Sequence, residues 1–222
     1  MTENRKPHRN GEISREKKPE FQISLLTNET LNLIIGGLEK IVPNWNHLYD
    51  TLTDAQKLKI QGVKNGDLLG RLAEVHVSRV LDSLAEDNPT IIRWPIANGQ
   101  ETKDFRLEKS GHNYVAYKKG GTTACVEYDM LTEVEGLPVI WEVKIGYSLA
   151  QAINSHRIKT IVKPLAQYYG HAEIAYVVVA PTGPNQQTIS QEKFIEKGGM
   201  IARIPTTRTL FESNIRSANG SS

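Results

Sequence analysis

Hydrophobic positions recur at steps of three and four residues in the first part of the chain. Between Ser24 and Pro43 they are Leu31, Ile34, Leu38 and Ile41. This spacing places apolar side chains on one face of a helix, which Pro43 would end. Two shorter helices are predicted from Trp45 to Leu52 and from Thr53 to Gly62, the latter opening with a Thr-x-x-Gln capping box. We therefore predict a small N-terminal helical segment over residues 24–63.

A longer helix is predicted from Asn65 to Asp87. Its apolar residues fall in one broad band at about 100° per residue. Glu74 lies at the margin of that band, one turn after Gly70, where the missing side chain would let another backbone approach. From the pattern alone, Glu74 is either a solvated helix charge or an acidic group at the edge of a buried face.

Strand-forming residues dominate after Pro95. Turn signals at Gly120-Gly121 and Glu135-Gly136 separate three runs that favour strands. These runs are Tyr114–Tyr117, Ala124–Val134 and Val139–Ile145. Because the turns between them are short, we predict that the three strands form an antiparallel meander.

Helices and strands alternate in the rest of the chain. The predicted elements are a helix over Ser148–Lys159 that restarts around Pro164, a strand over Ile174–Ala180, a helix over Gln191–Lys197 and a strand over Met200–Ile204. This order predicts an α/β fold with a mixed central β-sheet flanked by helices. The core would span residues 64–210, between a flexible arm at 1–23 and a C-terminal tail at 211–222.

Composition is that of an ordinary globular protein, at 39% hydrophobic and 23% charged residues. There is neither an apolar run of the roughly 20 residues that cross a bilayer nor an apolar core for a secretory signal near the N-terminus. We therefore expect a cytoplasmic, intracellular protein with no membrane span. The single Cys125 excludes an intrachain disulfide, and we expect it to be a small buried core residue.

Positive charge is concentrated at the N-terminus. The first 20 residues hold six Lys or Arg and four Glu, so their net charge of +2 equals that of the whole chain. Any basic surface on the core must therefore be local. Two sets of basic residues could face a phosphate backbone. Each set can instead be explained as part of a solvated surface. The two sets are His156, Arg157, Lys159 and Lys163, and Lys103, Arg106, Lys109, Lys118 and Lys119.

Acidic residues on two neighbouring predicted strands carry the candidate chemistry. Because alternate residues of a strand share a face, Glu127 and Asp129 would point one way, and Glu142 and Lys144 would do so on the next strand. Converging carboxylates with an ammonium group beside them suit a hard cation such as Mg²⁺ and phosphate chemistry. The plain alternative is a Glu142–Lys144 pair on the solvent face of an amphipathic strand.

The chain resembles the PD-(D/E)xK nuclease superfamily at these residues. Asp129 is followed, after twelve residues, by Glu142-Val143-Lys144 on the next predicted strand. The resemblance covers about two thirds of the chain and implies a restriction endonuclease-like core. It also implies that Asp129 and Glu142 bind Mg²⁺, with Mn²⁺ as a substitute, and that Lys144 orients the attacking water or stabilises charge. Glu74 matches an acidic residue of the leading helix that reaches the metal.

Some positions depart from or extend the family pattern. Tyr128 stands where the motif has its Pro, and Glu127 is an additional acid beside Asp129, which leaves the principal ligand open; we favour Asp129. Many members of the family place a Gln or Tyr on the helix after the Lys strand. The matching residues here are Gln167 and Tyr168.

Three functions are consistent with these residues. The leading hypothesis is a Mg²⁺-dependent, restriction-type endonuclease that hydrolyses DNA as a homodimer, with Asp129, Glu142, Lys144 and Glu74 as catalytic residues. A Holliday junction resolvase or a DNA-repair nuclease would share this chemistry and differ in the DNA shape that it requires. A noncatalytic nucleic-acid-binding module would keep the fold without the reaction.

Overall fold

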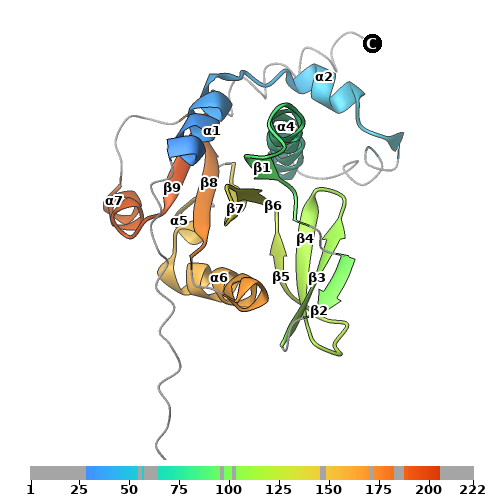
Figure 1. Ribbon diagram of the computed structural model, residues 1–222. Coiled ribbons are helices and arrows are strands. Elements are labelled where there is room, and N and C mark those ends of the chain that lie inside the picture. The colour runs from blue at the N-terminus through green and yellow to red at the C-terminus, as the bar shows by residue number, and fades with distance from the viewer. Residues whose placement is uncertain are drawn as a thin grey trace, which may run out of the picture.

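The chain forms two β-sheets, with helices against both faces of the larger one (Figure 1). The computed structural model describes residues 29–54, 57, 65–95, 98–101, 104–145, 149–170, 173–182 and 188–205 of the 222. Most of the helix predicted from Thr53 to Gly62 lies outside the described residues, as do the predicted arm and C-terminal tail.

The larger sheet has five strands in the order β1-β6-β7-β8-β9. They are β1 (Ile92–Arg93), β6 (Met130–Val134), β7 (Leu137–Val143), β8 (Ala175–Pro181) and β9 (Met200–Ile204). Strands β1, β6 and β7 pair antiparallel, whereas β7, β8 and β9 run parallel. The predicted α/β fold with a mixed central sheet is therefore confirmed.

The smaller sheet is antiparallel, in the order β2-β3-β4-β5. Its strands are β2 (Asn98–Glu101), β3 (Phe105–Ser110), β4 (Asn113–Lys118) and β5 (Ala124–Tyr128). The single meander predicted for residues 114–145 is wrong, because the run over Ala124–Val134 is two strands that belong to different sheets. The chain leaves the smaller sheet at Tyr128 and enters the larger one at Met130, with Asp129 between them.

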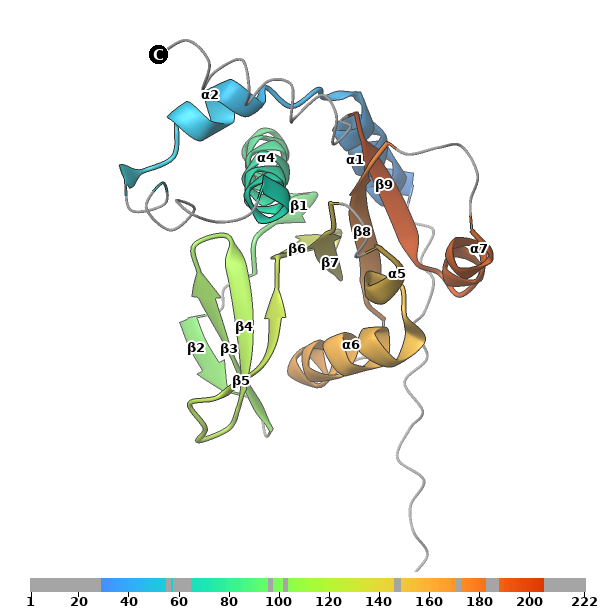
Figure 2. The same ribbon diagram turned by 180° about the vertical axis from the view of Figure 1, so that it is seen from behind.

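Helices cover the two faces of the larger sheet. On one face lie α1 (Glu29–Lys40), α2 (Trp45–Asp50) and α4 (Asn65–Asp87); on the other lie α5 (Leu149–Ala152), α6 (Ser155–Tyr169) and α7 (Ile189–Glu196). Both ribbon views place the smaller sheet beside α6, and α6 contacts β3 and β5 (Figures 1 and 2). No helix within the described ranges combines the length and apolar character needed to cross a bilayer.

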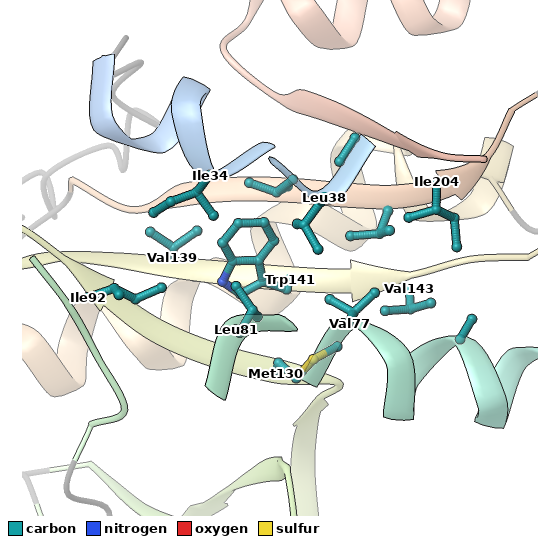
Figure 3. Close-up of a cluster of buried hydrophobic side chains, with 14 of the residues drawn as sticks. Ile34, Leu38, Val77, Leu81, Ile92, Met130, Val139, Trp141, Val143 and Ile204 are labelled. Atoms are coloured by element: carbon teal, nitrogen blue, oxygen red, sulfur yellow. The ribbon is translucent and has the colours of Figure 1, made fainter. Parts of the chain in front are cut away.

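Trp141 marks the centre of the larger core. Its ring lies between side chains of α1 and α4, including Leu38 and Leu81 (Figure 3). Alternation along β7 places Val139 and Val143 on this same face. Ile140 packs into the second core, on the α6 side. The same alternation turns the intervening charged residue of β7, Glu142, toward α6.

The segment after β7 differs from the prediction. A break at Ile153-Asn154 separates α5 from α6, and α6 then runs without interruption through Pro164. Asn154 caps α6 by accepting hydrogen bonds from the two N–H groups at His156 and Arg157. Proline removes one backbone donor from the helix, but the buried apolar face of α6 on both sides of it maintains the helix.

Cys125 is exposed, so its predicted place in the core is wrong. Its neighbour Val126 and the next alternate residue, Tyr128, are the buried positions of β5. Because successive side chains of a strand point to opposite faces, Cys125 and Glu127 lie on the open face of the smaller sheet.

Candidate active site

The structure brings together Asp129, Glu142 and Lys144, as the sequence predicted. The Lys144 ammonium lies 3.1 Å from Asp129 Oδ2 and 2.8 Å from Glu142 Oε1. Glu142 is in β7, and Lys144 follows that strand directly, with its backbone N–H donating to the Val179 carbonyl of β8 at 2.8 Å. The pairing of two central strands of the sheet therefore fixes the backbone of both residues.

Asp129 is held by the end of β7. Its Oδ2 accepts a hydrogen bond of 2.8 Å from the Val143 N–H, in addition to the Lys144 contact. Glu127 behaves differently: it is exposed and accepts a hydrogen bond from Asn113 across the smaller sheet. The expectation that Glu127 and Asp129 share one strand face fails, because β5 ends at Tyr128 and the alternation ends with it.

Glu142 is almost completely buried, at 1% exposure. Its Oε1 accepts hydrogen bonds from Lys144 Nζ and from Arg157 Nη2, both at 2.8 Å. Its Oε2 is buried and has no hydrogen-bond partner. A buried carboxylate with one unsatisfied oxygen is unfavourable on its own, so the site has unused capacity for a hydrogen-bond donor or a cation.

Burial and the neighbouring charges together raise the pKa values of Asp129 and Lys144. Burial above all, and then the nearby Glu142, raise the pKa of Asp129 to about 6 despite the adjacent ammonium. Burial alone would lower the pKa of Lys144, but Asp129 and Glu142 outweigh burial and raise it above its usual value. Lys144 is therefore protonated at neutral pH and is a donor of hydrogen bonds, not a base.

Glu74 stands in a neighbouring cluster of its own. Its Oε2 lies 3.6 Å from His112 Nε2 and 3.8 Å from Arg71 Nη1, and it makes no hydrogen bond. The Glu74 charge still contributes to the raised pKa of Asp129. His112 reaches Glu74 from the turn between β3 and β4, a hairpin that the sequence analysis did not predict.

Asp129 and Glu142 fit a Mg²⁺ ion that keeps part of its water shell. No three His, Cys, Asp or Glu side chains in the described part of the chain are grouped to hold a metal ion by themselves. Mg²⁺, however, usually retains several waters and is bound through one or two carboxylates together with substrate phosphates. The unpartnered Glu142 Oε2 and the partly buried Asp129 provide carboxylate oxygens, the type of atom that such an ion prefers.

Gln167 and Tyr168 lie in the C-terminal part of α6, whereas the contact with Glu142 comes from its first turn. Gln167 Oε1 is buried without a hydrogen-bond partner. Next to Tyr168, the Tyr169 hydroxyl donates to Glu133 at 2.9 Å, a carboxylate that also pairs with Arg93. This end of α6 therefore faces a second acidic residue of the sheet.

Arg157 joins the carboxylate site although its sequence context predicted only a solvated or phosphate-facing helix position. The Asn154 cap places Arg157 in the first turn of α6, and its side chain reaches Glu142 on β7. Helical spacing indicates which residues of α6 are exposed, but it gives no signal for a partner on another element.

No family model, curated protein or solved structure matches this chain. The proposals below therefore depend on the residues and their geometry.

Proposed function

We propose that this protein is a metal-dependent nuclease of the PD-(D/E)xK type that hydrolyses phosphodiester bonds in DNA. One observation carries the proposal: two carboxylates and a protonated lysine converge at the junction of two sheets, with one buried carboxylate oxygen left unpartnered. The combination provides oxygen ligands for a cation and a fixed positive charge beside them.

Asp129 and Glu142 would hold Mg²⁺, which would lower the pKa of a bound water and neutralise phosphate charge. Lys144 would donate a hydrogen bond to a phosphate oxygen as negative charge develops there. In the reaction, the water oxygen forms a bond to phosphorus, one ester P–O bond breaks, and the departing oxygen takes up a proton. The Val143 N–H keeps the Asp129 carboxylate oriented throughout.

A noncatalytic DNA-binding module is the second candidate, and one contact favours it. Glu142 Oε1 is already neutralised by Lys144 and Arg157, as in an ion pair that serves the fold alone. Such a protein would bind DNA through basic residues and leave it intact.

Cleavage assays separate the two candidates. The protein is incubated with supercoiled plasmid and with a four-way junction, in Mg²⁺ and in EDTA. We expect Mg²⁺-dependent cleavage that falls about 100-fold or more in Asp129→Asn, Glu142→Gln and Lys144→Ala, because each loses a ligand or a charge used in the transition state. Glu127→Gln is the matched control, since this neighbouring acid lies outside the cluster, and it should cut like the wild type.

The outcomes are distinct. DNA binding without cleavage of either substrate supports the noncatalytic module, and equal cleavage by the wild type and the three variants shows that the site is elsewhere. Preference for the junction over plasmid indicates a resolvase or repair enzyme, whereas discrete fragments from linear DNA indicate a restriction-type enzyme. Light scattering with and without DNA tests the proposed homodimer.

A further inference from the structure

Two cations share one oxygen of Glu142. Lys144 Nζ and Arg157 Nη2 both lie 2.8 Å from Oε1, while Oε2 has no hydrogen-bond partner. We propose that Arg157 is a substrate-binding residue that pairs with Glu142 in the free protein and moves to a DNA phosphate when a divalent cation and DNA bind. This inference rests on the proposed nuclease function and adds a residue that the nuclease motif does not contain.

Charge repulsion explains why one of the two cations should leave. A carboxylate that takes up a divalent ion has less negative charge to offer to an ammonium and a guanidinium at the same oxygen. The attraction that holds Arg157 and Lys144 is then replaced by repulsion from the ion. By linkage, the Arg157 contact with Glu142 must in turn weaken metal binding.

Burial and partners identify Arg157 as the group that moves. The Lys144 side chain is 20% exposed and donates to Asp129 and to the Val143 carbonyl, so leaving Glu142 would not free it. The Arg157 side chain is 47% exposed, and its ion pair in the described structure is with Glu142 alone. Its guanidinium also donates a hydrogen bond to the hydroxyl of Tyr176, a neutral group. Rotation of this long, half-exposed side chain toward solvent gives up one ion pair and one hydrogen bond to a neutral group, and the Tyr176 hydroxyl keeps its contact with the Ala152 carbonyl.

The surface around Arg157 favours a phosphate as its second partner. His156, Lys159 and Lys163 are exposed on the same helix, so α6 presents further basic residues to solvent. A planar guanidinium binds phosphate oxygens through two parallel hydrogen bonds, which makes Arg suited to positioning a DNA strand. Contacts between such a helix and the phosphates of DNA orient the DNA without reading its base sequence.

The competing interpretation is that Arg157 and Glu142 form a purely structural salt bridge between α6 and β7. The two interpretations predict different changes in metal affinity when Arg157 is removed. If Arg157 only holds the helix to the sheet, its removal leaves Glu142 worse placed, and affinity for the metal stays the same or falls. If Arg157 competes with the metal, its removal increases metal affinity while DNA affinity decreases. Opposite changes in the two affinities are therefore the distinguishing result.

The test uses the full chain and four proteins: wild type, Arg157→Gln, Arg157→Lys and Lys163→Gln. Lys163→Gln is the matched control because it removes one exposed positive charge from the same helix without touching Glu142. Mg²⁺ affinity is measured by titration calorimetry without DNA, and affinity for a labelled duplex by fluorescence anisotropy in Ca²⁺. Thermal unfolding in EDTA verifies that every variant is folded.

We expect Arg157→Gln to bind Mg²⁺ about fivefold more tightly, the scale of a half-exposed ion pair, and to bind the duplex about tenfold more weakly. Lys163→Gln should bind the duplex more weakly with unchanged Mg²⁺ affinity, and Arg157→Lys should restore part of both wild-type values. Unchanged or weaker Mg²⁺ binding by a folded Arg157→Gln overturns the inference. If the wild type cleaves DNA in that case, the proposed function stands; if the wild type neither binds Mg²⁺ nor cleaves DNA, both fail.

Discussion

A single hydrogen bond determines how the largest fully buried side chain is accommodated. The Trp141 indole N–H donates to Thr132 Oγ1 at 2.9 Å, and both residues are fully buried. An indole donor without an acceptor would be unfavourable at this depth, because water cannot replace the missing partner. The threonine on β6 therefore permits a tryptophan at the centre of β7.

Thr132→Val should destabilise the protein by about 1 to 3 kcal/mol, since valine fills the same space but leaves the indole N–H unpaired. In a Trp141→Phe background, where no such donor exists, the same Thr132→Val change should cost much less. Urea unfolding of the four proteins in this double-mutant cycle gives the coupling. Thr132→Ser, which keeps the hydroxyl, is the control; a loss for Ser with little or none for Val would show that the methyl group, not the hydrogen bond, matters.

Residues of the candidate site could be predicted from the sequence where a charged residue interrupts an apolar strand. Glu142 lies within Val139–Val143, so burial implied a partner or a function, and the structure shows Lys144 beside it. Arg157 could not be assigned to the site from the sequence. Its contact with Glu142 joins α6 to β7, and the periodicity of one helix does not indicate which residue of another element it meets. Glu74 was predicted to be near the site, but the unpredicted β3–β4 turn supplies its nearest partner, His112.

At the scale of elements, packing of α2 against α4 encloses a histidine. His76 of α4 is 6% exposed, its ring is tilted by 58° against that of Trp45 in α2, and its buried Nε2 has no hydrogen-bond partner. Burial lowers the pKa of His76 more than its hydrogen bond to the Ile41 backbone raises it. Arg79 and His47 line the same cavity, so a charged His76 would also meet positive neighbours.

The packing of α2 on α4 should therefore weaken in mild acid. His76 binds its proton more readily in the unfolded chain, where its pKa is about 6.5, than in the folded protein. Its contribution is fully favourable above that pH, and stability falls as the pH drops below it. Urea unfolding in EDTA between pH 5 and 8 should show this loss in the wild type and a smaller one in His76→Phe. His47→Gln, a change at the exposed histidine of α2, should retain the wild-type slope; a reduced slope would assign the effect to His47.

The elements that matched prediction are those with a long, consistent pattern. Helix α4 begins and ends as predicted, and β8 and β9 overlap their predicted runs closely. Strand β3, Phe105–Ser110, has charged residues at three of its six positions and only two apolar ones, so its sequence resembles a surface loop. The break at Asp129 is invisible for a related reason: strand-forming residues continue on both sides, and only pairing with different sheets separates β5 from β6.

At the scale of the whole molecule, the candidate site occupies the place where the two sheets join. Asp129 is the single residue between β5 of the smaller sheet and β6 of the larger one, and its carboxylate is tied to Val143 at the end of β7. The α6 helix packs against both sheets and supplies Arg157. A ligand that binds both Asp129 and Glu142 would therefore connect the junction of the two sheets to β7. Such a ligand should increase the free energy of unfolding of the whole protein.

Mg²⁺ should raise the unfolding temperature of the wild type for this reason. Binding to the folded state alone adds about 1.4 kcal/mol when the free ion is ten times its Kd. Calorimetric scans in EDTA and in Mg²⁺ measure the shift, with an equal ionic strength of NaCl as the control for screening. Asp129→Asn and Glu142→Gln each remove a carboxylate at the junction and should abolish most of the shift, whereas Glu127→Gln should keep it. If the increase in unfolding temperature persists in both site variants, the ion binds elsewhere on the chain. If the wild type shows no increase but still cleaves DNA, the ion binds only together with a DNA phosphate.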